Sequence, residues 1–292
     1  MSADPRIHLP RDCGPKIARY SVITPTASLR KKPSNAAAQE SEIIYGQAFD
    51  VYRLSRGWAW GQLVTPSQRP GYIGYVKAKS LGGAAPEPTN QVISMGAPVF
   101  TKPDIKSYIA MVLPLNALLS ESSEGEGEDF IHIGPKQYVH RKNTRLLSSQ
   151  RSAEQIEEAH RRLLEEPPTG PNDYVSVAEA HIGLPYIWGG VSSFGLDCSG
   201  LVQSSLRAAG CDVPRDSDMQ MNEIGTAMPI KLRGLARGDL IFWKGHVAIM
   251  SSETEIVHAN AHHMKTAREP LKRAAQRIKA SGGGDILAIR RL

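Results

Sequence analysis

Residues 196–203 have the sequence Leu-Asp-Cys-Ser-Gly-Leu-Val-Gln, and this stretch decides how the C-terminal part of the chain folds. We predict a helix over 198–209 that ends at Gly210, because glycine readily adopts the left-handed conformation that ends helices. Three apolar residues on successive turns anchor one face of this helix: Leu201, Val202 and Leu206. Cys198 therefore stands at the start of a helix that is held in place by its buried face.

The position of Cys198 suits a nucleophile. The first backbone N–H groups of the helix and the positive end of its dipole would stabilise a thiolate, so we expect the pKa of Cys198 to be lowered toward neutrality. Held on a rigid element with its tip toward the surface, such a thiolate could attack a substrate. The alternative for a lone cysteine is a small apolar residue in the core, which is the commoner role.

Two histidines favour the nucleophile interpretation. Two predicted strands, joined by a turn over 251–254, carry one histidine each. If Met250 pairs with Thr254, His246 lies directly opposite His258, with the two Cβ atoms roughly 5 Å apart on one face of the sheet. One imidazole could then act as a general base while the other orients it through a hydrogen bond.

The same residue types also admit a zinc site. Cys198, Cys211, His246 and His258 supply zinc-type ligands, and His262 follows His258 at a helical interval. However, the sequence has no Cys-x2-Cys pair, and Cys211 lies at the far end of the predicted helix, roughly 20 Å from Cys198. We therefore predict neither a metal nor any other cofactor.

The N-terminal half has a different pattern. After a polar tail over 1–16, short runs rich in aromatic and β-branched residues alternate with turn signals over 17–81. This spacing predicts a small β-barrel, followed by a linker over 82–88 that is rich in glycine, alanine and proline. A weaker copy of the strand pattern follows over 91–147, with an acidic stretch over 121–129 that we expect at a solvated hairpin tip.

After the second predicted barrel the pattern changes to a mixture of helices and strands. A capping box at Ser152 and Gln155 opens a predicted helix over 152–164. Another helix is predicted over 173–182 and is closed by Gly183. Strands are predicted over 239–243, 245–250, 255–259 and 286–290. Together these elements predict an α+β domain.

Composition bounds the class of protein. The 292 residues include 35 Lys and Arg against 29 Asp and Glu, a formal charge of +6, with 41% hydrophobic and 22% charged residues. These values are ordinary for a soluble globular protein, and no apolar run is long enough to span a bilayer. The positive charges are scattered and their densest cluster, over 30–32, is small, so we expect no nucleic-acid partner.

The cysteine count and the first residues bear on the compartment. Three cysteines cannot all pair within one chain, so at least one thiol is free. The first residues lack the basic and apolar segments of a secretory signal peptide. We therefore expect a cytoplasmic protein with reduced thiols and no membrane partner.

Several linked motifs together resemble a known family. They are Leu184-Pro185-Tyr186-Ile187-Trp188-Gly189-Gly190, the 196–203 stretch, Gly238-Asp239-Leu240-Ile241-Phe242-Trp243, Gly245-His246-Val247-Ala248-Ile249 and His258-Ala259. In this order and at these spacings they resemble the NlpC-type cell-wall cysteine peptidases. The motifs that resemble bacterial SH3-like domains are Gly57-Trp58-Ala59-Trp60 and Gly71-Tyr72-Ile73-Gly74-Tyr75-Val76.

The resemblance implies a multidomain fold class, in which two small SH3-like β-barrels are followed by an α+β papain-like cysteine peptidase domain. The first barrel matches the SH3-like pattern more closely than the second, and we expect the protein to be a monomer. The expected boundaries are an N-terminal tail over 1–16, a first SH3-like domain over 17–85, a second and divergent one over 89–150, a helical linker over 151–171 and the peptidase domain over 172–292.

The resemblance also implies roles for the residues singled out above. Cys198 would be the nucleophile, His246 the base and His258 the polar residue that orients it. Tyr186 would donate its hydroxyl to the oxyanion hole beside the backbone N–H of Cys198, and donors aimed at developing charge are worth several kcal/mol in enzymes generally. The alternative for Tyr186 is a half-buried aromatic residue that follows a turn proline.

A further segment resembles one that binds substrate in the subgroup with N-terminal SH3-like barrels. There, a sequence like that of residues 214–220 binds the free amino terminus of a short muropeptide, and here Asp216 offers a carboxylate and Ser217 a hydrogen-bond acceptor to an ammonium group. The alternative for Asp216 is to cap the next helix. The other residues expected to contact substrate are Asp197, Ser199, Trp188, Tyr72, Tyr75 and Glu42.

The resemblance therefore implies a cysteine endopeptidase that hydrolyses the γ-D-glutamyl bond to a diamino acid, meso-diaminopimelate or lysine. Its partner would be a free murein peptide with an N-terminal L-Ala, and the absence of a signal peptide favours peptidoglycan recycling over wall cutting. Two alternatives stay open. One is a protein that binds peptidoglycan peptides without cleaving them, and the other is a papain-like acyl or amide transferase.

Overall fold

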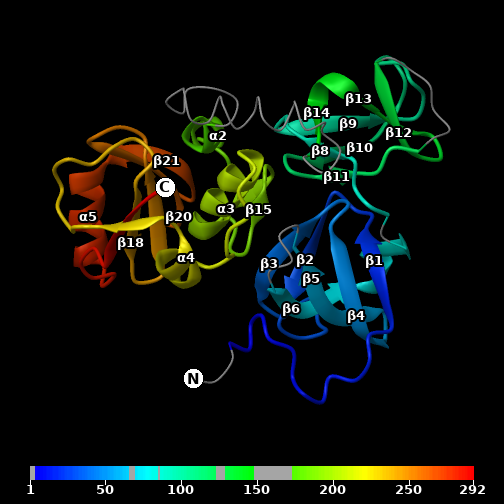
Figure 1. Cartoon of the computed structure of the whole chain (residues 1–292), viewed down its shortest axis with the longest axis horizontal. Helices are drawn as coiled ribbons and strands as arrows, with labels where there is room; N and C mark the ends of the chain where they lie inside the picture. The colour runs from blue at the N-terminus through cyan, green and yellow to red at the C-terminus, as the bar shows by residue number, and fades with distance from the viewer. Residues whose placement is uncertain (1–3, 66–69, 85, 123–128, 148–172) are drawn as a thin grey trace. The chain divides into compact units, whose positions relative to one another are not determined.

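The chain forms two compact units, which are residues 1–162 and 163–292 (Figure 1). Two predicted features, the helix over 152–164 and most of the acidic stretch over 121–129, lie outside the described residues. The computed structural model describes residues 4–65, 70–84, 86–122, 129–147 and 173–292.

The region predicted as the first barrel forms one antiparallel sheet of seven strands, in the order β3-β2-β6-β5-β4-β1-β7. Alternation along β4 shows why it folds this way, because Phe49 and Val51 are buried whereas Asp50 and Tyr52 are partly exposed. The strands are β1 (Ala18–Val22), β2 (Thr26–Arg30), β3 (Gln39–Ile44), β4 (Ala48–Ser55), β5 (Trp58–Val64), β6 (Pro70–Lys77) and β7 (Leu81–Ala84).

The predicted linker over 82–88 is wrong at its start. Ser21 of β1 lies opposite Gly82, and Tyr20 lies opposite Ala84, so these residues belong to β7. Glycine and alanine are poor strand formers, which is why their run resembled a linker. Pairing with β1 uses only backbone groups, and the strand therefore forms without side chains that favour it.

The predicted N-terminal tail is an extended segment that binds the first sheet. The backbone N–H of Ile73 donates to the carbonyl of Arg6 at 2.9 Å, and the side-chain amide of Gln62 donates to the carbonyl of Ile7 at 2.7 Å. Further along, the N–H of Ile17 donates to a carbonyl of β4 at 2.7 Å. The tail is thus part of this unit's hydrogen-bonded structure.

Residues 90–146 form two smaller antiparallel sheets, in the orders β10-β9-β13-β12 and β11-β8-β14. If the strands of this region are counted from β8, their order is the same as that of the strands in the first sheet. The order is interrupted once, because the fourth and fifth strands, β11 and β12, lie in different sheets. The strands are β8 (Asn90–Val92), β9 (Gly96–Phe100), β10 (Ile109–Pro114), β11 (Leu118–Leu119), β12 (Phe130–Gly134), β13 (Gln137–His140) and β14 (Thr144–Leu146). Short helical turns, η1 (Ala78–Ser80) and η2 (Arg141–Asn143), precede the last strand of each region.

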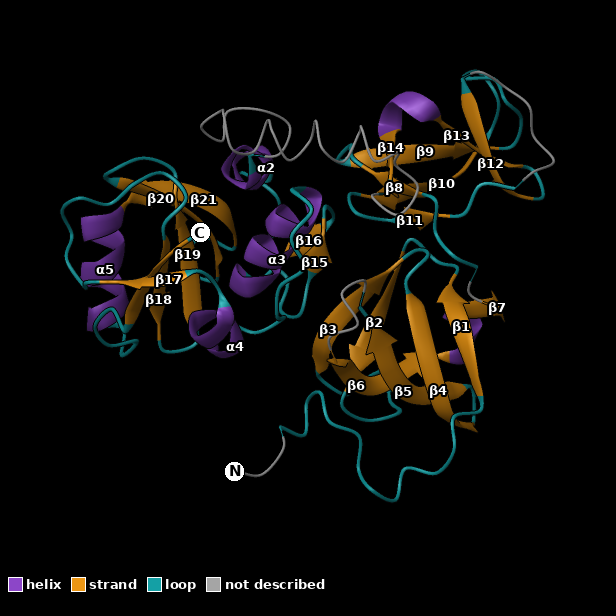
Figure 2. Ribbon diagram, viewed as in Figure 1, coloured by secondary structure: helices purple, strands orange, loops and turns teal. Residues whose placement is uncertain are grey.

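The second unit is built on a six-stranded sheet with helices on both faces (Figure 2). Its strand order is β17-β22-β18-β19-β20-β21, and a two-stranded hairpin of β15 and β16 precedes α3. The strands are β15 (Val191–Ser192), β16 (Gly195–Leu196), β17 (Thr226–Met228), β18 (Leu240–Trp243), β19 (His246–Met250), β20 (Glu255–Asn260), β21 (Lys265–Pro270) and β22 (Ala288–Arg291). The helices are α2 (Tyr174–Ala180), α3 (Cys198–Ala208), α4 (Ser217–Glu223) and α5 (Leu271–Ala280).

Alternate residues of the central strands supply two separate apolar cores. Val247 and Ile249 pack with α2 and α3, whereas Ala248 and Met250 pack with α5. This is the period-two pattern of a sheet that is covered on both faces, and it explains why the central strands are almost continuously apolar. The arrangement places the start of α3 and the α5 helix on opposite faces (Figure 2).

The predicted helices and strands of this unit are confirmed, whereas the short strands β15, β16 and β17 and two larger elements were not predicted. Both α2 and α3 begin and end within two residues of the predicted bounds, and Gly183 and Gly210 are left-handed with φ of 94°. We did not predict β21 or α5. Their sequences carry several exposed charged residues, so neither has a long apolar run.

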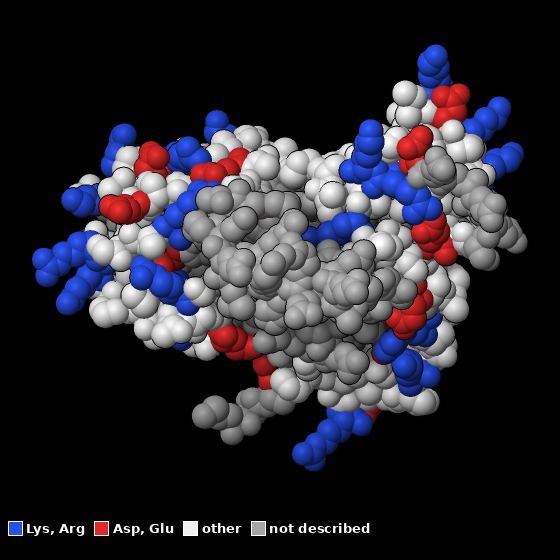
Figure 3. Space-filling model, turned by 45° about the horizontal axis from the view of Figure 1, so that its top comes forward, with Lys and Arg blue, Asp and Glu red and all other residues white. Residues whose placement is uncertain are grey.

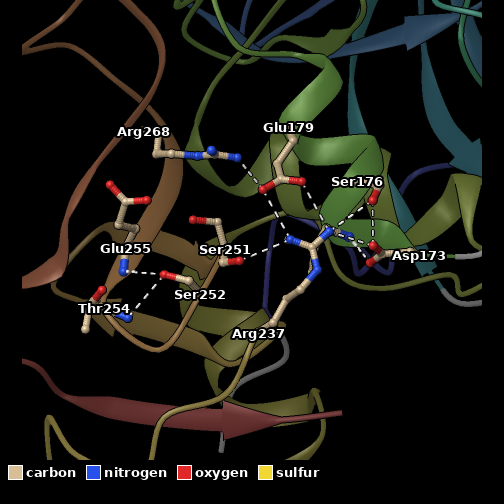
Figure 4. Close-up of polar contacts among 10 residues, drawn as sticks. Asp173, Ser176, Glu179, Arg237, Ser251, Ser252, Thr254, Glu255 and Arg268 are labelled. Carbon is tan, nitrogen blue, oxygen red and sulfur yellow. Dashed lines mark hydrogen bonds and ion pairs between the residues drawn. The ribbon is translucent and has the colours of Figure 1, made fainter. Parts of the chain in front are cut away.

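A polar network ties α2 to the sheet (Figure 4). The Arg237 guanidinium donates to the buried Asp173 carboxylate at 2.6 Å and to the Glu179 carboxylate at 3.2 Å. Glu179 also pairs with Arg268 of β21, and Arg237 donates to the carbonyl of Ser251 at 3.1 Å. These contacts join α2, the segment before β18, the end of β19 and β21 into one body.

The surface carries both signs of charge. Basic and acidic side chains are interspersed on the face shown in Figure 3. Within the described ranges, no helix has the length and apolar character needed to cross a membrane.

Candidate active site

The Cys198 thiol lies at the first turn of α3, where Asp197 caps the helix. The Asp197 carboxylate accepts from the backbone N–H of Gly200 at 2.7 Å. Gly200 fits tightly, because a Cβ at this position would lie 2.1 Å from the carbonyl oxygen of Gly190. Cys198 is 8% exposed, and its Sγ lies 4.0 Å from the carbonyl oxygen of Gly245, the residue before His246. The thiol therefore lies against the backbone at the start of β19, the strand that begins with His246.

The expected lowering of the Cys198 pKa is wrong for the substrate-free site. Burial raises the pKa of the thiol to about 12, although the backbone N–H groups of Val247 and Ser199 oppose the rise. The physical reason is that the free-energy cost of removing a thiolate from water exceeds the stabilisation by these N–H groups. The negative charge of the nearby Asp197 carboxylate destabilises the thiolate further. Cys198 is therefore a neutral thiol at rest and needs a base.

His246 and His258 lie on one face of the sheet, but in a different register from the predicted one. Met250 pairs with Ile256 and not with Thr254, although the turn over 251–254 is as predicted. Continued along the strands, this register puts His246 opposite Asn260 instead of His258. A shift of two residues keeps every side chain on its face. The two imidazoles are therefore diagonal neighbours, and Nε2 of His246 lies 2.8 Å from Nδ1 of His258.

The turn itself explains the register. The Ser252 hydroxyl accepts from the backbone N–H groups of Thr254 and Glu255, at 3.3 and 3.1 Å (Figure 4). The N–H of Ser251 donates to the carbonyl of Glu255 at 2.9 Å. These bonds stabilise the turn in the register that pairs Met250 with Ile256, because a serine hydroxyl can replace missing backbone partners.

The histidine pair continues to a carboxylate that the sequence prediction missed. Nε2 of His258 lies 2.8 Å from Oε1 of Glu269 in β21, and Arg277 of α5 contacts the same oxygen. Burial opposes ionisation, but the hydrogen bond to His258 and the charge of Arg277 lower the pKa of Glu269 to about 2. Strand alternation could have found Glu269, since it faces Ile256, two residues before His258.

His246 is suited to act as a base. Burial, together with the adjacent His258, lowers its pKa to about 3, so its imidazole is neutral at neutral pH. A neutral imidazole can take the proton of a neutral thiol as sulfur attacks a carbonyl. Cys198, His246 and His258 therefore have the chemical properties expected of a nucleophile, a base and a polar residue that orients the base.

Tyr186 lies at the same site. Its backbone N–H donates to the carbonyl of Met264 at 3.1 Å, and it forms an isolated bridge with Leu196. Burial, and then the neighbouring Cys198 and Asp197, raise the pKa of Tyr186 to about 12, so its hydroxyl keeps its proton. The described geometry brings this donor near the thiol, where an oxyanion would form.

Asp197 and Ser199, predicted to contact substrate, form bonds inside the protein. Arg215 donates to Asp197 at 2.6 Å and to the Ser199 hydroxyl at 2.9 Å, and Arg215 and Asp197 are both buried. Asp197 also accepts from the N–H of Gly189 at 2.9 Å. These bonds hold the start of α3, and contact of these residues with substrate stays a prediction.

The remaining predicted substrate residues fall into two groups. Asp216 precedes α4 but makes no capping hydrogen bond with its side chain, so the capping alternative is not supported, and Ser217 is the first residue of α4. Trp188 is 67% exposed on the loop between Tyr186 and Cys198. The predicted residues of the first sheet belong to the other unit, and their role in a pocket stays a prediction: Tyr72, Tyr75 and Glu42.

One described group has donor atoms of the kinds that bind metals. His258, His263 and Glu269 present ligand atoms within 4.8 Å of one another. However, His258 already faces the Glu269 carboxylate at hydrogen-bond distance, and Arg277 supplies the positive charge next to it. We therefore assign His258 and Glu269 to the hydrogen-bonded row behind His246, whereas Nδ1 of His263 lies 2.9 Å from Oδ1 of Asn260.

A cysteine peptidase site requires a thiol and a histidine that a second polar residue orients, and this domain has a buried thiol at a helix N-terminus and two hydrogen-bonded histidines. Residues 183–278 match the model of the NlpC/P60 family, and residues 29–81 match the bacterial dipeptidyl-peptidase SH3 domain. The chain therefore carries a domain of the NlpC/P60 family of cysteine peptidases, preceded by an SH3-like domain.

Similar proteins agree with this assignment. The chain is 26% identical over 246 residues to a gamma-D-glutamyl-L-lysine dipeptidyl-peptidase of Bacillus cereus, a match that covers 77% of this chain and 68% of that protein. A Bacillus subtilis protein of the same name is 25% identical, with 70% of this chain and 64% of that protein covered. The fold matches the crystal structure of an NlpC/P60 family protein from Bacillus cereus with a TM-score of 0.72 and 20% identity, over 94% of this chain and 99% of that one.

Proposed function

We propose that the protein hydrolyses the bond between the γ-carboxyl of D-Glu and a diamino acid in free murein peptides that begin with L-Ala. The observation that carries this proposal is the hydrogen-bonded pair of His246 and His258 in a domain of the peptidase family, with the Cys198 thiol 4.0 Å from the carbonyl oxygen of Gly245, next to His246. Two relatives are named for action on a γ-D-glutamyl-L-lysine bond, which supports the same bond here.

The site residues would carry the reaction in two stages. His246 takes the thiol proton as Sγ of Cys198 attacks the γ-carbonyl of D-Glu, and the Tyr186 hydroxyl and a backbone N–H stabilise the oxyanion. The imidazolium then gives its proton to the amine of the leaving diamino acid, and the C–N bond breaks. Water, deprotonated by His246, hydrolyses the thioester and releases L-Ala-D-Glu and the free thiol.

Asp216 would read the amino terminus of the peptide. Asp216 is partly exposed and directly precedes α4. A carboxylate of this kind pairs well with the ammonium of L-Ala, and Ser217 adds an acceptor. An N-terminal ammonium exists only on released peptides, which favours a role in recycling cytoplasmic fragments.

We also infer that residues 90–146 are a second, divergent SH3-like domain. The support is the strand order, which repeats that of the first seven-stranded sheet with one interruption. The interruption falls where β11 has only two residues, whereas the corresponding β4 has eight. A strand this short offers few backbone groups to pair with β12.

The proposal is tested by incubating the enzyme with L-Ala-γ-D-Glu-meso-diaminopimelate and with the corresponding lysine peptide. We expect release of L-Ala-D-Glu from the preferred peptide, and at least a tenfold loss of kcat/KM when the L-Ala amine is acetylated. Binding of both peptides without release would instead indicate a binding protein. Transfer of the acyl group to an added amine in preference to water would indicate a transferase.

A further inference from the structure

A carboxylate that the proposed reaction does not use lies directly behind the two histidines. Glu269 belongs to β21, and its side chain is 14% exposed. Its Oε1 lies 2.8 Å from Nε2 of the fully buried His258 side chain, and Arg277 from α5 contacts this same oxygen. His263 is farther away, with Nδ1 4.0 Å from the carboxylate.

The nature of each group fixes where the protons lie along this row. Glu269 is ionised and can only accept, so the hydrogen between it and His258 is carried by Nε2 of the imidazole. Burial lowers the pKa of His258, so this imidazole is neutral and its Nδ1 has no proton. Nδ1 must then accept from Nε2–H of His246, 2.8 Å away. His246 keeps an unprotonated Nδ1, the nitrogen that can accept the thiol proton.

We propose that Glu269 is a positioning residue that sets the tautomer of His246 through His258. The inference rests on the proposed peptidase function, because the tautomer matters only if His246 is the base for Cys198. Without an acceptor behind His258, its proton is free to sit on either nitrogen. His246 would then be free to carry its own proton on Nδ1, and in that form it cannot deprotonate the thiol.

Arg277 also contributes to the proposed control of the His246 tautomer. Its guanidinium only donates, so it requires an oxygen at the position where His258 also finds its acceptor. If glutamine replaced Glu269, Arg277 would hold the amide oxygen, and not the amide nitrogen, toward His258. Glu269→Gln should therefore keep the tautomer and lose the charge, whereas Glu269→Ala loses both.

The test compares Glu269→Gln and Glu269→Ala with Glu253→Gln, a control at an exposed position in the β19–β20 turn. For Glu269→Ala we expect kcat on the L-Ala-γ-D-Glu peptide to fall about 100- to 1000-fold while KM changes less than about threefold. For Glu269→Gln we expect a fall of about tenfold, and for the control no change beyond about twofold.

Long-range proton–nitrogen spectra of enzyme labelled with ¹⁵N-histidine should show His246 protonated on Nε2 in the wild type and in Glu269→Gln, and a mixture of tautomers in Glu269→Ala.

One pattern of results would overturn the proposal. If Glu269→Ala lowers only the unfolding temperature, with wild-type kcat per folded molecule and an unchanged His246 spectrum, then Glu269 merely holds β21 to α5. The spectra need no substrate, so they separate the two hypotheses. If the wild type fails to release L-Ala-D-Glu but its histidines show the expected tautomers, the proposed function fails and the role of Glu269 in setting the tautomer stands.

Discussion

The two faces of the six-stranded sheet in the second unit do different work. On the α3 face, Val247 and Ile249 pack under the helix that carries Cys198, so packing positions the nucleophile. On the α5 face, hydrogen bonds connect His258 to Glu269, so charge and protonation are set there. The faces meet at the start of β19, where the thiol lies beside Gly245. The difference teaches that one sheet can separate the part of a site that needs rigidity from the part that needs a chosen protonation state.

The strongest way to test this division is to remove the nucleophile. Cys198→Ala should lower kcat/KM by about 10⁴-fold or more, because the base has nothing to activate, while the unfolding temperature changes little. Peptide cleavage assayed by product chromatography measures the loss. Cys211→Ala is the matched control, since this thiol is exposed beyond the end of α3. Equal activity of Cys198→Ala and wild type would refute the assignment of the nucleophile.

The next largest effect is on the stability of the α3 face. Arg215→Met leaves the Asp197 carboxylate buried without its cation, which should cost about 3–5 kcal/mol. Hydrogen exchange of the α3 amides in the full chain measures this loss. Adding Asp197→Asn to this variant removes the unpaired charge and should recover part of the stability. A single variant as stable as the wild type would show that the ion pair does not hold α3.

A smaller effect should follow from crowding the start of α3. Gly200→Ala places a Cβ 2.1 Å from the Gly190 carbonyl oxygen, so the backbone must move. We expect a loss of about 1–3 kcal/mol in stability and a lower kcat, because Cys198 moves with the helix. Thermal unfolding and peptide cleavage check both effects. If kcat is unchanged although stability falls, the position of the thiol is less critical than the comparison of the two faces implies.

The smallest expected change is a shift along the pH axis, and it probes the α5 face. A histidine is charged below its pKa, and burial lowers the pKa of His246, so the neutral base persists to lower pH than in a free histidine. We therefore expect the midpoint of the acidic limb of the kcat/KM profile to lie below pH 6.5. Initial rates between pH 4 and 8 measure the limb, with circular dichroism to confirm that the protein stays folded. A limb at or above pH 6.5 would contradict burial as the dominant influence on His246.

The helix α3 was predicted well because the residues that determine its bounds and its buried face lie within it or directly after it. Leu201 and Leu206 define the buried face, and Gly210 ends the helix through its own backbone preference. The strands that carry His246 and His258 were also predicted, since both are apolar runs bounded by turn residues. The prediction that His246 and His258 share one face is confirmed although the predicted register is wrong, because an error of two residues leaves each side chain on the same face.

The features that the prediction missed depend on contacts between distant segments. Glu269 lies in an edge strand whose polar sequence has no strand signal of its own, and it meets His258 only through the pairing of β20 with β21. The pKa of Cys198 was predicted in the wrong direction because the helix start is visible in the sequence and burial is not. Sequence patterns thus predict helices, strands and the faces of their side chains more readily than the protonation states of those side chains.

Burial of the Cys198 thiol in its neutral form also has a consequence for damage by oxidants. Peroxides react with thiolates far more readily than with thiols, so a protonated and shielded sulfur is a poor target. Cys211 is exposed and Cys13 is partly exposed. Oxidising agents should therefore convert these two cysteines to sulfenic acid first and leave the Cys198 thiol reduced.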